Sequence, residues 1–304
     1  MSTPAQPLRS AAWRDDTAIA PTPSSAEPIV LASNLVLEAD CAAVLPRLPD
    51  GAFELIYIDP PFNTGAPRRH RRLAVARDED GDRTGFGGRR YRSSAAGETL
   101  AYDDSFDDYL AFLTPKLERA RELLAPEGTL YVHLDYREAH YVKVALDRIF
   151  GRDCFLNEII WAYDYGAKPA RRWPAKHDTI LVYVRTPGGH LFDADAVERE
   201  PYMAPGLVGP EKAARGKRPT DTWWHTIVAT AGRERTGYPT QKPEGIVRRI
   251  VSASSRPGGW CLDFFAGSGT LGAVCEQLGR RYVLIDSSPQ AIAVIRRRLR
   301  LDAS

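Results

Sequence analysis

An apolar stretch that stops at two prolines constrains the fold of this chain more than any other feature. Residues 53–58 read Phe-Glu-Leu-Ile-Tyr-Ile, and Asp59, Pro60 and Pro61 follow them. Such a run is typical of a buried parallel strand. The strand must end there, because proline has no amide hydrogen for a sheet and fixes its own φ angle. We therefore expect Asp59 on a stiff turn at the carboxyl end of a strand.

This turn carries two hydrogen-bond acceptors and an aromatic ring. The Asp59 carboxylate and the Pro60 carbonyl can accept the two N–H bonds of an amino group on a flat molecule, and the Phe62 ring can stack on its face. With its hydrogens held in this way, the nitrogen can turn its lone pair out of the ring plane and act as a nucleophile. The alternative is an ordinary turn in which Asp59 only caps the backbone.

Strand and helix patterns alternate along most of the chain. Apolar runs predict further strands at residues 34–37, 129–134, 158–161, 179–184, 260–263 and 281–286. Apolar residues at helical spacing predict helices at residues 106–124, 141–150 and 245–253. This alternation is typical of an α/β fold with a doubly wound sheet, flanked by helices on both faces.

A glycine-rich turn follows the predicted strand at residues 260–263. Gly267, Gly269 and Gly272 match the G-x-G-x-x-G pattern of dinucleotide-binding proteins, and Asp286 ends the next predicted strand. A turn without Cβ atoms lets the backbone approach a ligand closely. The pattern alone therefore leaves open an NAD-dependent oxidoreductase.

The carboxylates around this turn favour a different ligand. Asp263 stands directly before the glycines, where it is a poor neighbour for a pyrophosphate but a good one for the ammonium of an amino acid. Asp286 can hold both hydroxyls of a ribose. S-adenosylmethionine has an amino-acid end and an adenosine end, and so satisfies both carboxylates. No set of residues for hydride chemistry accompanies the glycines.

Composition excludes several other classes of protein. The chain has 304 residues, of which 43% are apolar, and a formal net charge of +2. Its four cysteines lie far apart, with no C-x-x-C spacing and no paired histidines, so we predict neither a metal site nor disulfide bonds. No apolar run is long enough to span a membrane, and the N-terminus lacks the pattern of a signal peptide. We expect a protein that acts inside the cell, in a reducing cytoplasm.

Composition also divides the chain into segments. Residues 1–28 are rich in Ala, Pro, Ser and Thr and predict a disordered leader, which leaves residues 29–304 as one domain. Residues 66–100 have no regular pattern and predict a mobile loop rich in arginine and glycine. Guanidinium groups pair with phosphates, so this loop can follow a nucleic-acid backbone, although a solvated insertion is the alternative. Its candidate contacts are Arg68, Arg69, Arg71, Arg72, Arg89 and Arg90.

Two more segments can contact a nucleic acid. Residues 168–177 form a basic loop with one tryptophan, in which Arg171, Arg172 and Lys176 are the candidate contacts. As an ordinary surface loop, the same segment needs no partner. In residues 186–237 the sheet pattern lapses, and we interpret this stretch as a small target-recognition segment. Its Trp223-Trp224 pair is more typical of a local core than of a platform for bases.

Together these motifs resemble the amino-methylating DNA methyltransferases of the permuted beta order. In that order the catalytic segment, here Asp59-Pro60-Pro61-Phe62, precedes the cofactor segment, here Asp263 to Thr270. Thr240-Gln241-Lys242-Pro243 is a third matching motif, and the resemblance covers residues 34–299. It implies a Rossmann-like, seven-stranded mixed sheet flanked by helices, in circularly permuted order. It also implies S-adenosylmethionine as the cofactor and double-stranded DNA as the substrate.

The resemblance assigns roles to individual residues. Asp59, Pro60, Pro61 and Phe62 would form the catalytic turn, and Thr240 and Lys242 would close over the methionine end of the cofactor. Asp286 would bind its ribose, and Asp40 would lie near its adenine. The remaining cofactor contacts would be Asp263, Phe264, Phe265, Gly267, Ser268, Gly269 and Thr270.

The resemblance also suggests a target base and partners. Asp before Pro-Pro is commoner among adenine-N6 enzymes than among cytosine-N4 enzymes, so adenine is favoured and cytosine is the alternative. Methylation of RNA or of a protein amide is a further alternative. Members are often dimers, and a restriction endonuclease, if there is one, would be a separate chain.

Overall fold

The fold is described from a computed structural model. It describes residues 17–21, 27–63, 68–70, 73–77, 80, 83–84, 90–95, 100–102, 108–166, 169–229 and 232–301. These residues form two compact units, one made of residues up to 62 and from 108 onward, the other of residues 63–107. In the described part of the chain, no helix has the length and apolar character needed to cross a membrane.

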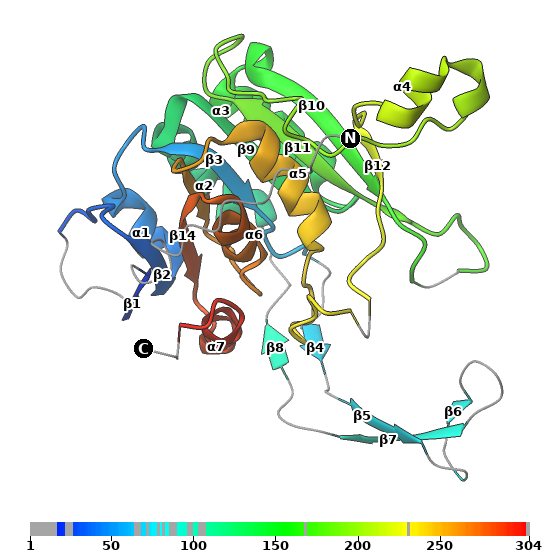
Figure 1. Ribbon diagram of the computed structural model, residues 1–304. Helices are drawn as coiled ribbons and strands as arrows, with labels where there is room; N and C mark the ends of the chain where they lie inside the picture. Colours follow the sequence, from blue (N-terminus) through cyan, green and yellow to red (C-terminus); the bar gives the residue numbers. More distant parts are fainter. Residues whose placement is uncertain are drawn as a thin grey trace. The chain divides into compact units, whose positions relative to one another are not determined.

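The first unit is built on a mixed sheet (Figure 1), whose strand order is β1-β2-β14-β13-β3-β9-β11-β10-β12. The strands are β1 (Thr17–Pro21), β2 (Asn34–Glu38), β3 (Phe53–Ile58), β9 (Leu124–Leu134), β10 (Phe155–Ala162), β11 (His177–Val184), β12 (Thr222–Trp224), β13 (Trp260–Asp263) and β14 (Arg281–Asp286). β11 runs antiparallel to both its neighbours, and every other pair in this sheet is parallel.

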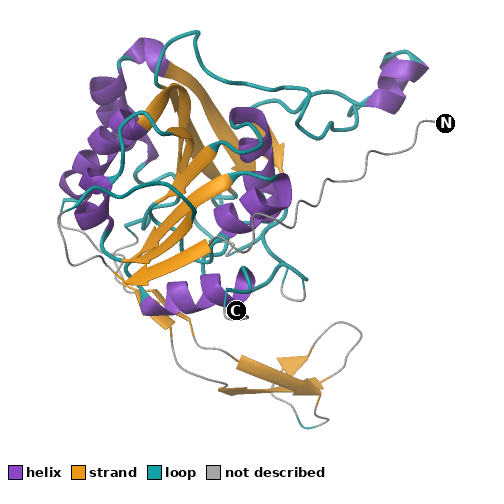
Figure 2. Cartoon of the chain, turned by 60° about the vertical axis from the view of Figure 1, so that its left-hand side comes forward, coloured by secondary structure: helices purple, strands orange, loops and turns teal. Residues whose placement is uncertain are grey.

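Helices cover both faces of the sheet (Figure 2). They are α1 (Cys41–Val44), α2 (Tyr109–Leu123), α3 (Ala139–Phe150), α5 (Glu244–Ser254), α6 (Thr270–Leu278) and α7 (Pro289–Arg298), and a short α4 (Pro210–Arg215) lies farther out. Single 3₁₀ turns occur at Leu45–Arg47, Arg152–Cys154 and Pro205–Leu207. The predicted α/β fold with a doubly wound sheet is confirmed.

Local sequence explains where these helices begin. The Asp108 side chain caps α2 by accepting a hydrogen bond from the Ala111 amide at 2.9 Å. The Ser288 hydroxyl caps α7 in the same way, and Pro289 takes the first helical position, where no amide hydrogen is needed. α2, α3 and α5 each bury an apolar stripe, which is the pattern that predicted them.

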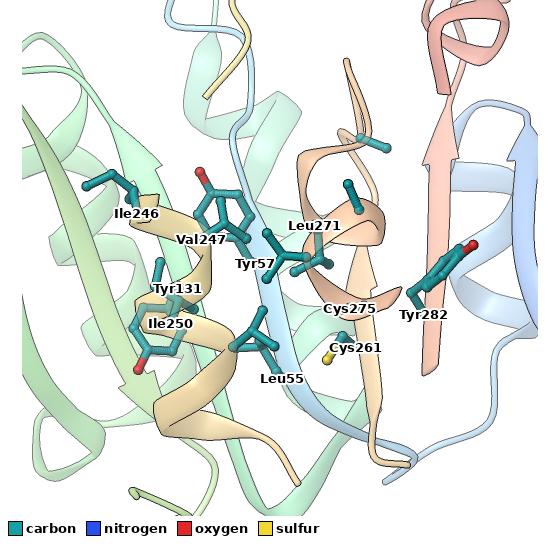
Figure 3. Close-up of a cluster of buried hydrophobic side chains, with 14 of the residues drawn as sticks. Leu55, Tyr57, Tyr131, Ile246, Val247, Ile250, Cys261, Leu271, Cys275 and Tyr282 are labelled. Atoms are coloured by element: carbon teal, nitrogen blue, oxygen red, sulfur yellow. The ribbon is translucent and has the colours of Figure 1, made fainter. Parts of the chain in front are cut away.

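The core on one face of the sheet lies beneath α5, α6 and α7. Figure 3 shows Ile246, Val247 and Ile250 of α5 packed over Leu55 and Tyr57 of β3. All five side chains are fully or almost fully buried. α5 is thereby fixed against the strand that leads into Asp59.

The predicted seven strands are the inner seven of the sheet, and the count is corrected to nine by two edge strands. β1 lies within the predicted leader, so that prediction is wrong for residues 17–21; residues 1–16 and 22–26 lie outside the described residues. Its short apolar run pairs with the open edge of β2. β12 comes from the predicted recognition segment and pairs with β10, so this segment is part of the first unit.

Residues 63–107 form the second unit. It includes residues 66–100, whose prediction as a loop without regular structure is wrong. It contains β4 (Arg68–His70), β5 (Leu73–Arg77), β6 (Arg83–Thr84), β7 (Arg90–Ala95) and β8 (Leu100–Tyr102). β4 pairs with β8, and β7 pairs with β5 and β6, in every case antiparallel. Backbone hydrogen bonds form these ladders, and they leave little trace in an arginine- and glycine-rich sequence. That the segment is mobile stays a prediction.

A bulge in β9 depends on a glycine. The register with β3 shifts from Phe53 opposite Leu124 to Leu55 opposite Thr129, so the residues between them loop out. A Cβ atom on Gly128 would lie 2.7 Å from the Phe53 carbonyl oxygen and 2.9 Å from that of Ala125. Both are backbone atoms, which cannot move aside without disturbing the strand pair.

We therefore expect Gly128→Ala to lower the free energy of unfolding by about 1–3 kcal/mol, as overpacking does elsewhere. Urea denaturation measures the change. Gly206→Ala is the control, because a Cβ atom at exposed Gly206 would have nothing within 4 Å and should change stability by less than about 0.5 kcal/mol. Equal stability of both variants would contradict this account of the bulge.

Candidate active site

Three predicted carboxylates meet at one edge of the sheet. Asp59 follows β3, Asp263 ends β13 and Asp286 ends β14, and these three parallel strands are neighbours. The pairing of Cys261 with Leu55 puts β13 beside β3, although about two hundred residues separate them in the chain. Because the carboxyl ends of parallel strands share an edge, the predicted catalytic and cofactor segments are brought together as expected.

The glycine-rich turn is closed by hydrogen bonds to two of these carboxylates. The Gly267 amide donates to Asp286 Oδ2 at 2.8 Å, and the Ser288 amide donates to Asp286 Oδ1 at 2.9 Å. The Phe265 amide donates to Asp263 Oδ1 at 3.0 Å. Gly269 has a φ of 71°, and a Cβ atom there would lie 2.9 Å from the Ile295 side chain. The turn therefore requires glycine at this position.

The electrostatics of this edge favour a cationic ligand. Asp263 is only 3% exposed, and burial raises its pKa well above the ordinary value, with further increases from the nearby charges of Asp59 and Asp286. Burial also raises the pKa of Asp286, although two backbone amides oppose the change. Buried acids that repel one another are stabilised as carboxylates by a positive charge.

Lys242 supplies such a charge. Its ammonium is paired with Asp59 Oδ2. It also lies 4.6 Å from the centroid of the Phe62 ring. Within the described residues, the other oxygen, Asp59 Oδ1, is buried without a hydrogen-bond partner. The Asp59 carboxylate, which is predicted to accept the amino group of a substrate, is thus in contact with the ammonium of Lys242. That the segment of Lys242 closes over the methionine end of the cofactor, as the resemblance implies, stays a prediction.

The other predicted cofactor residues lie around the glycine turn. Asp40 follows β2, beside β14, and its carboxylate caps α1 by accepting from the Ala42 amide at 2.9 Å. Thr240 lies in the turn before Lys242. Phe264 is fully buried, whereas Phe265 is half-buried against Phe112.

Ser268 and Thr270 are buried and held by an arginine that the sequence did not single out. Arg298 of α7 donates to the Ser268 carbonyl at 3.1 Å and to Thr270 Oγ1 at 3.0 Å. Its other nitrogen donates to Glu244 Oε1 at 2.8 Å. In the sequence, Arg298 is one of three consecutive arginines and looks like a solvated helix end. Thr270 Oγ1 in turn donates to the Lys242 carbonyl at 3.1 Å.

A second group missed by sequence reasoning lies beside Phe62. It consists of Tyr57, His133, Asp178 and Tyr163, from four neighbouring strands or their ends. The sequence patterns gave His133 no role. The only sequence signal was its place at the end of a predicted strand.

The predicted DNA contacts are spread over both units. Arg68 and Arg69 are on β4, and Arg90 is exposed at the start of β7, while Arg71, Arg72 and Arg89 lie outside the described residues. Arg171 and Arg172 are exposed in the loop between β10 and β11, beside Trp173, which is 94% exposed.

Lys176 and the Trp223-Trp224 pair have roles inside the first unit. The Lys176 ammonium donates to the carbonyls of Tyr165 and Gly166, at 2.6 and 2.9 Å, and so ties its own loop. Trp223 is buried and belongs to the core, whereas Trp224 is 74% exposed. The interpretation of the pair as a local core therefore holds for Trp223 alone.

Comparison with known proteins agrees with this geometry. The family model for N6/N4 methyltransferases, which is described as DNA methylase, matches residues 53–297 of this chain. The chain is 30% identical over 255 residues to the type II methyltransferase M.HpaI of Haemophilus parainfluenzae, covering 84% of this chain and 70% of that protein. It is 27% identical over 272 residues to the DNA adenine methyltransferase YhdJ of Escherichia coli K12, covering 87% and 82%.

Solved structures show the same fold. The PvuII cytosine-N4-specific DNA methyltransferase matches with a TM-score of 0.60 and 15% identity, over 90% of this chain and 88% of that one. The M1.HpyAVI complex with S-adenosylmethionine matches with a TM-score of 0.56 and 20% identity, over 87% and 98%. The alternative of an NAD-dependent oxidoreductase is wrong. The chain belongs to the N6/N4 family of DNA methylases.

Proposed function

We propose that this DNA methyltransferase uses S-adenosylmethionine to methylate the exocyclic amino group of a flipped-out base, with adenine N6 as the target. One observation carries the proposal. The carboxylate of Asp59, on a turn stiffened by two prolines, lies next to the glycine turn, and one of its oxygens is buried and has no hydrogen-bond partner among the residues that the structure describes. An amino group entering there would meet an acceptor already in place.

The acidic edge of the sheet fits the cofactor. S-adenosylmethionine carries a sulfonium and an ammonium, and the buried carboxylates of Asp263 and Asp286 are stabilised by positive charge. Asp263 would accept from the ammonium, Asp286 from the ribose hydroxyls, and Asp40 would lie near the adenine. Gly269 would let the backbone approach. Once bound, this cofactor supplies an electrophilic methyl group.

The residues of the catalytic turn would then hold and activate the base. A base inside a duplex cannot reach a buried carboxylate, so it must leave the stack, and contact with Phe62 offsets part of the lost stacking. Asp59 and the Pro60 carbonyl would accept the two N–H bonds, which frees the nitrogen lone pair for an in-line attack on the methyl group. The new N–C bond would replace the bond between the methyl group and sulfur, whose electron pair stays on the departing thioether, and Asp59 would take the proton that the nitrogen loses. No covalent bond to the protein is needed. Pro61 keeps the turn rigid.

Adenine is preferred over cytosine on two grounds. YhdJ, a relative over most of this chain, is named as an adenine methyltransferase. Asp59 also stands where the resemblance favours adenine enzymes. Cytosine N4 remains the second candidate, because both amines offer the same pair of donors to Asp59 and Pro60.

Positive residues of both units would follow the DNA backbone. We propose this role for Arg171 and Arg172, which are exposed, and for the arginines at positions 68, 69, 71, 72, 89 and 90 of the second unit. Residues 186–237 would contribute to sequence recognition. A homodimer, a separate restriction endonuclease and action on the bacterial nucleoid in the cytoplasm belong to the same proposal.

The target base can be read from genomic DNA. After expression in a host without its own DNA methylation, we expect N6-methyladenine in one sequence context. Asp59→Ala should leave the DNA unmodified while binding S-adenosylmethionine with an affinity within about threefold of the wild type, because Asp263 and Asp286, the proposed cofactor contacts, are kept. Sequencing that detects modified bases measures the methylation, and calorimetry measures the affinity. N4-methylcytosine would replace adenine as the target, and full modification by Asp59→Ala would contradict the proposed catalytic turn.

Cofactor binding should depend on pH. The raised pKa of Asp263 means that this group keeps its proton up to a higher pH than an ordinary aspartate, whereas an ammonium binds the carboxylate. Below the raised pKa, binding therefore releases a proton, and affinity should rise with pH up to that pKa and then level off. Calorimetry in buffers of different ionisation enthalpy counts the protons. Asp263→Asn should bind more weakly and release fewer protons; equal release by both proteins would contradict this role.

The ion pair of Lys242 should stabilise the fold through Asp59. Lys242→Met keeps the apolar stem but leaves a largely buried carboxylate without its cation, so the free energy of unfolding should fall by roughly 2–3 kcal/mol. In an Asp59→Asn background the same substitution should cost clearly less. Urea denaturation of the four proteins measures this coupling. Additive effects would mean that the pair does not contribute to stability.

A further inference from the structure

A row of polar side chains crosses the sheet beside the catalytic turn. His133, at the end of β9, is fully buried. Its Nδ1 is 3.0 Å from the Tyr57 hydroxyl of β3, and its Nε2 is 3.1 Å from Asp178 Oδ2 of β11. The Tyr163 hydroxyl donates to the second oxygen, Asp178 Oδ1, at 3.0 Å. The imidazole is thus held at both nitrogens.

These hydrogen bonds fix how the ring is oriented. Burial alone would raise the pKa of Asp178, but hydrogen bonds from His133 and Tyr163, with the charge of Lys242, lower it overall, so the group is a carboxylate. Burial raises the pKa of Tyr57, which keeps its phenol proton. Tyr57 can then donate to Nδ1 while Nε2–H donates to Asp178, which satisfies every partner with one tautomer.

Aromatic contacts transmit this orientation to the catalytic turn. The His133 ring meets the edge of Trp161, with centroids 5.5 Å apart and planes at 85°. It also contacts Phe62, with centroids 6.1 Å apart and planes at 34°. Phe62 is the ring over which the Lys242 ammonium lies. The position of Phe62 therefore depends on a ring that is itself held from three directions.

Stability does not require this arrangement. Apolar residues at both positions 133 and 178 would fill the space beside Trp161 and Phe62 without burying a histidine and a carboxylate, and such replacements of a whole buried pair are often neutral or stabilising. The buried polar row is instead located where the reaction needs a fixed geometry. Through His133, this row contacts Phe62 of the catalytic turn.

We propose that His133 is a positioning residue for the methyl transfer. Held by Tyr57 and Asp178, it would fix the Phe62 ring at the angle at which a flipped base stacks with its amino group at Asp59. This inference rests on the proposed function of the catalytic turn. His133 touches neither reactant, so its loss should lower kcat through poorer alignment of the base, and should leave cofactor binding unchanged.

The chain contains a matched control for this proposal. Tyr57 and Tyr131 are opposite each other in the register of β3 and β9, and both are buried. Figure 3 shows their hydroxyl groups pointing in opposite directions. That of Tyr57 reaches His133, whereas that of Tyr131 pairs with Ser254 Oγ at 2.7 Å. Replacing either tyrosine with phenylalanine removes one buried hydrogen bond and keeps the ring.

The experiment compares Tyr57→Phe, Tyr131→Phe and His133→Phe with the wild type. Thermal unfolding, the affinity for S-adenosylmethionine, kcat and KM for DNA are measured for each protein. The fluorescence of 2-aminopurine, placed at the target base identified by sequencing, reports the stacking of the flipped base. We expect kcat to fall about tenfold in Tyr57→Phe and about a hundredfold in His133→Phe, with altered fluorescence. Tyr131→Phe should stay within about twofold of the wild type at a similar loss of stability.

Equal kcat values for Tyr57→Phe and Tyr131→Phe would overturn the proposal, and would make His133 a structural residue only. Because this pair decides the matter alone, a His133→Phe protein that does not fold leaves the test intact. The wild type and Asp59→Ala are assayed in parallel. A wild type that does not methylate DNA, or an Asp59→Ala that does, refutes the proposed function and not the role of His133.

Discussion

The repulsion between carboxylates at the ends of adjacent strands is the constraint on which the site depends. Asp59, Asp263 and Asp286 are brought together by the order β14-β13-β3, and because Asp263 is buried and the other two are partly buried, water screens their charges only incompletely. The raised pKa of Asp263, from burial first and neighbouring charge second, expresses this cost. Backbone amides at Gly267 and Phe265 offset part of it. The repulsion that these amides do not offset makes this edge of the sheet a receptor for a cation, which is the property that a sulfonium cofactor requires.

Lys242 connects the two halves of this receptor. Its carbonyl accepts from Thr270, at the start of the helix that follows the glycine turn, while its ammonium is paired with Asp59. One short segment is therefore fixed to the cofactor turn by its backbone and to the catalytic turn by its side chain. The ammonium sits over Phe62 and beside Asp59, where a base would place its own amino group. A base entering the site must displace this ammonium or share the carboxylate with it, so entry of the base and movement of Lys242 are coupled.

Sequence patterns predicted the parts of the molecule that depend on local order. The strand that ends at Pro60, the glycine turn and the inner seven strands follow from apolar runs and from residues that cannot continue a strand. The edge strand β1, the ladders of residues 63–107 and the pairing of Lys242 with Asp59 do not, because each depends on a partner distant in the chain. His133 was missed for the same reason: Tyr57 and Asp178 lie 76 and 45 residues away from it. A histidine in an apolar run has no local signal that separates a positioning role from ordinary packing.

Both turns of the site are held by side chains that their own motifs do not contain. On the cofactor side, Arg298 ties the Ser268 carbonyl and Thr270 Oγ1 to Glu244 of α5. On the base side, His133 holds Phe62 through partners on β3 and β11. The motifs supply the groups that contact the reactants, but their geometry comes from a second layer of charged and aromatic residues in helices and neighbouring strands. A chain that kept both motifs and lost this layer would retain the chemistry at the site without its alignment, and since most of the rate comes from alignment, it would be a poor enzyme.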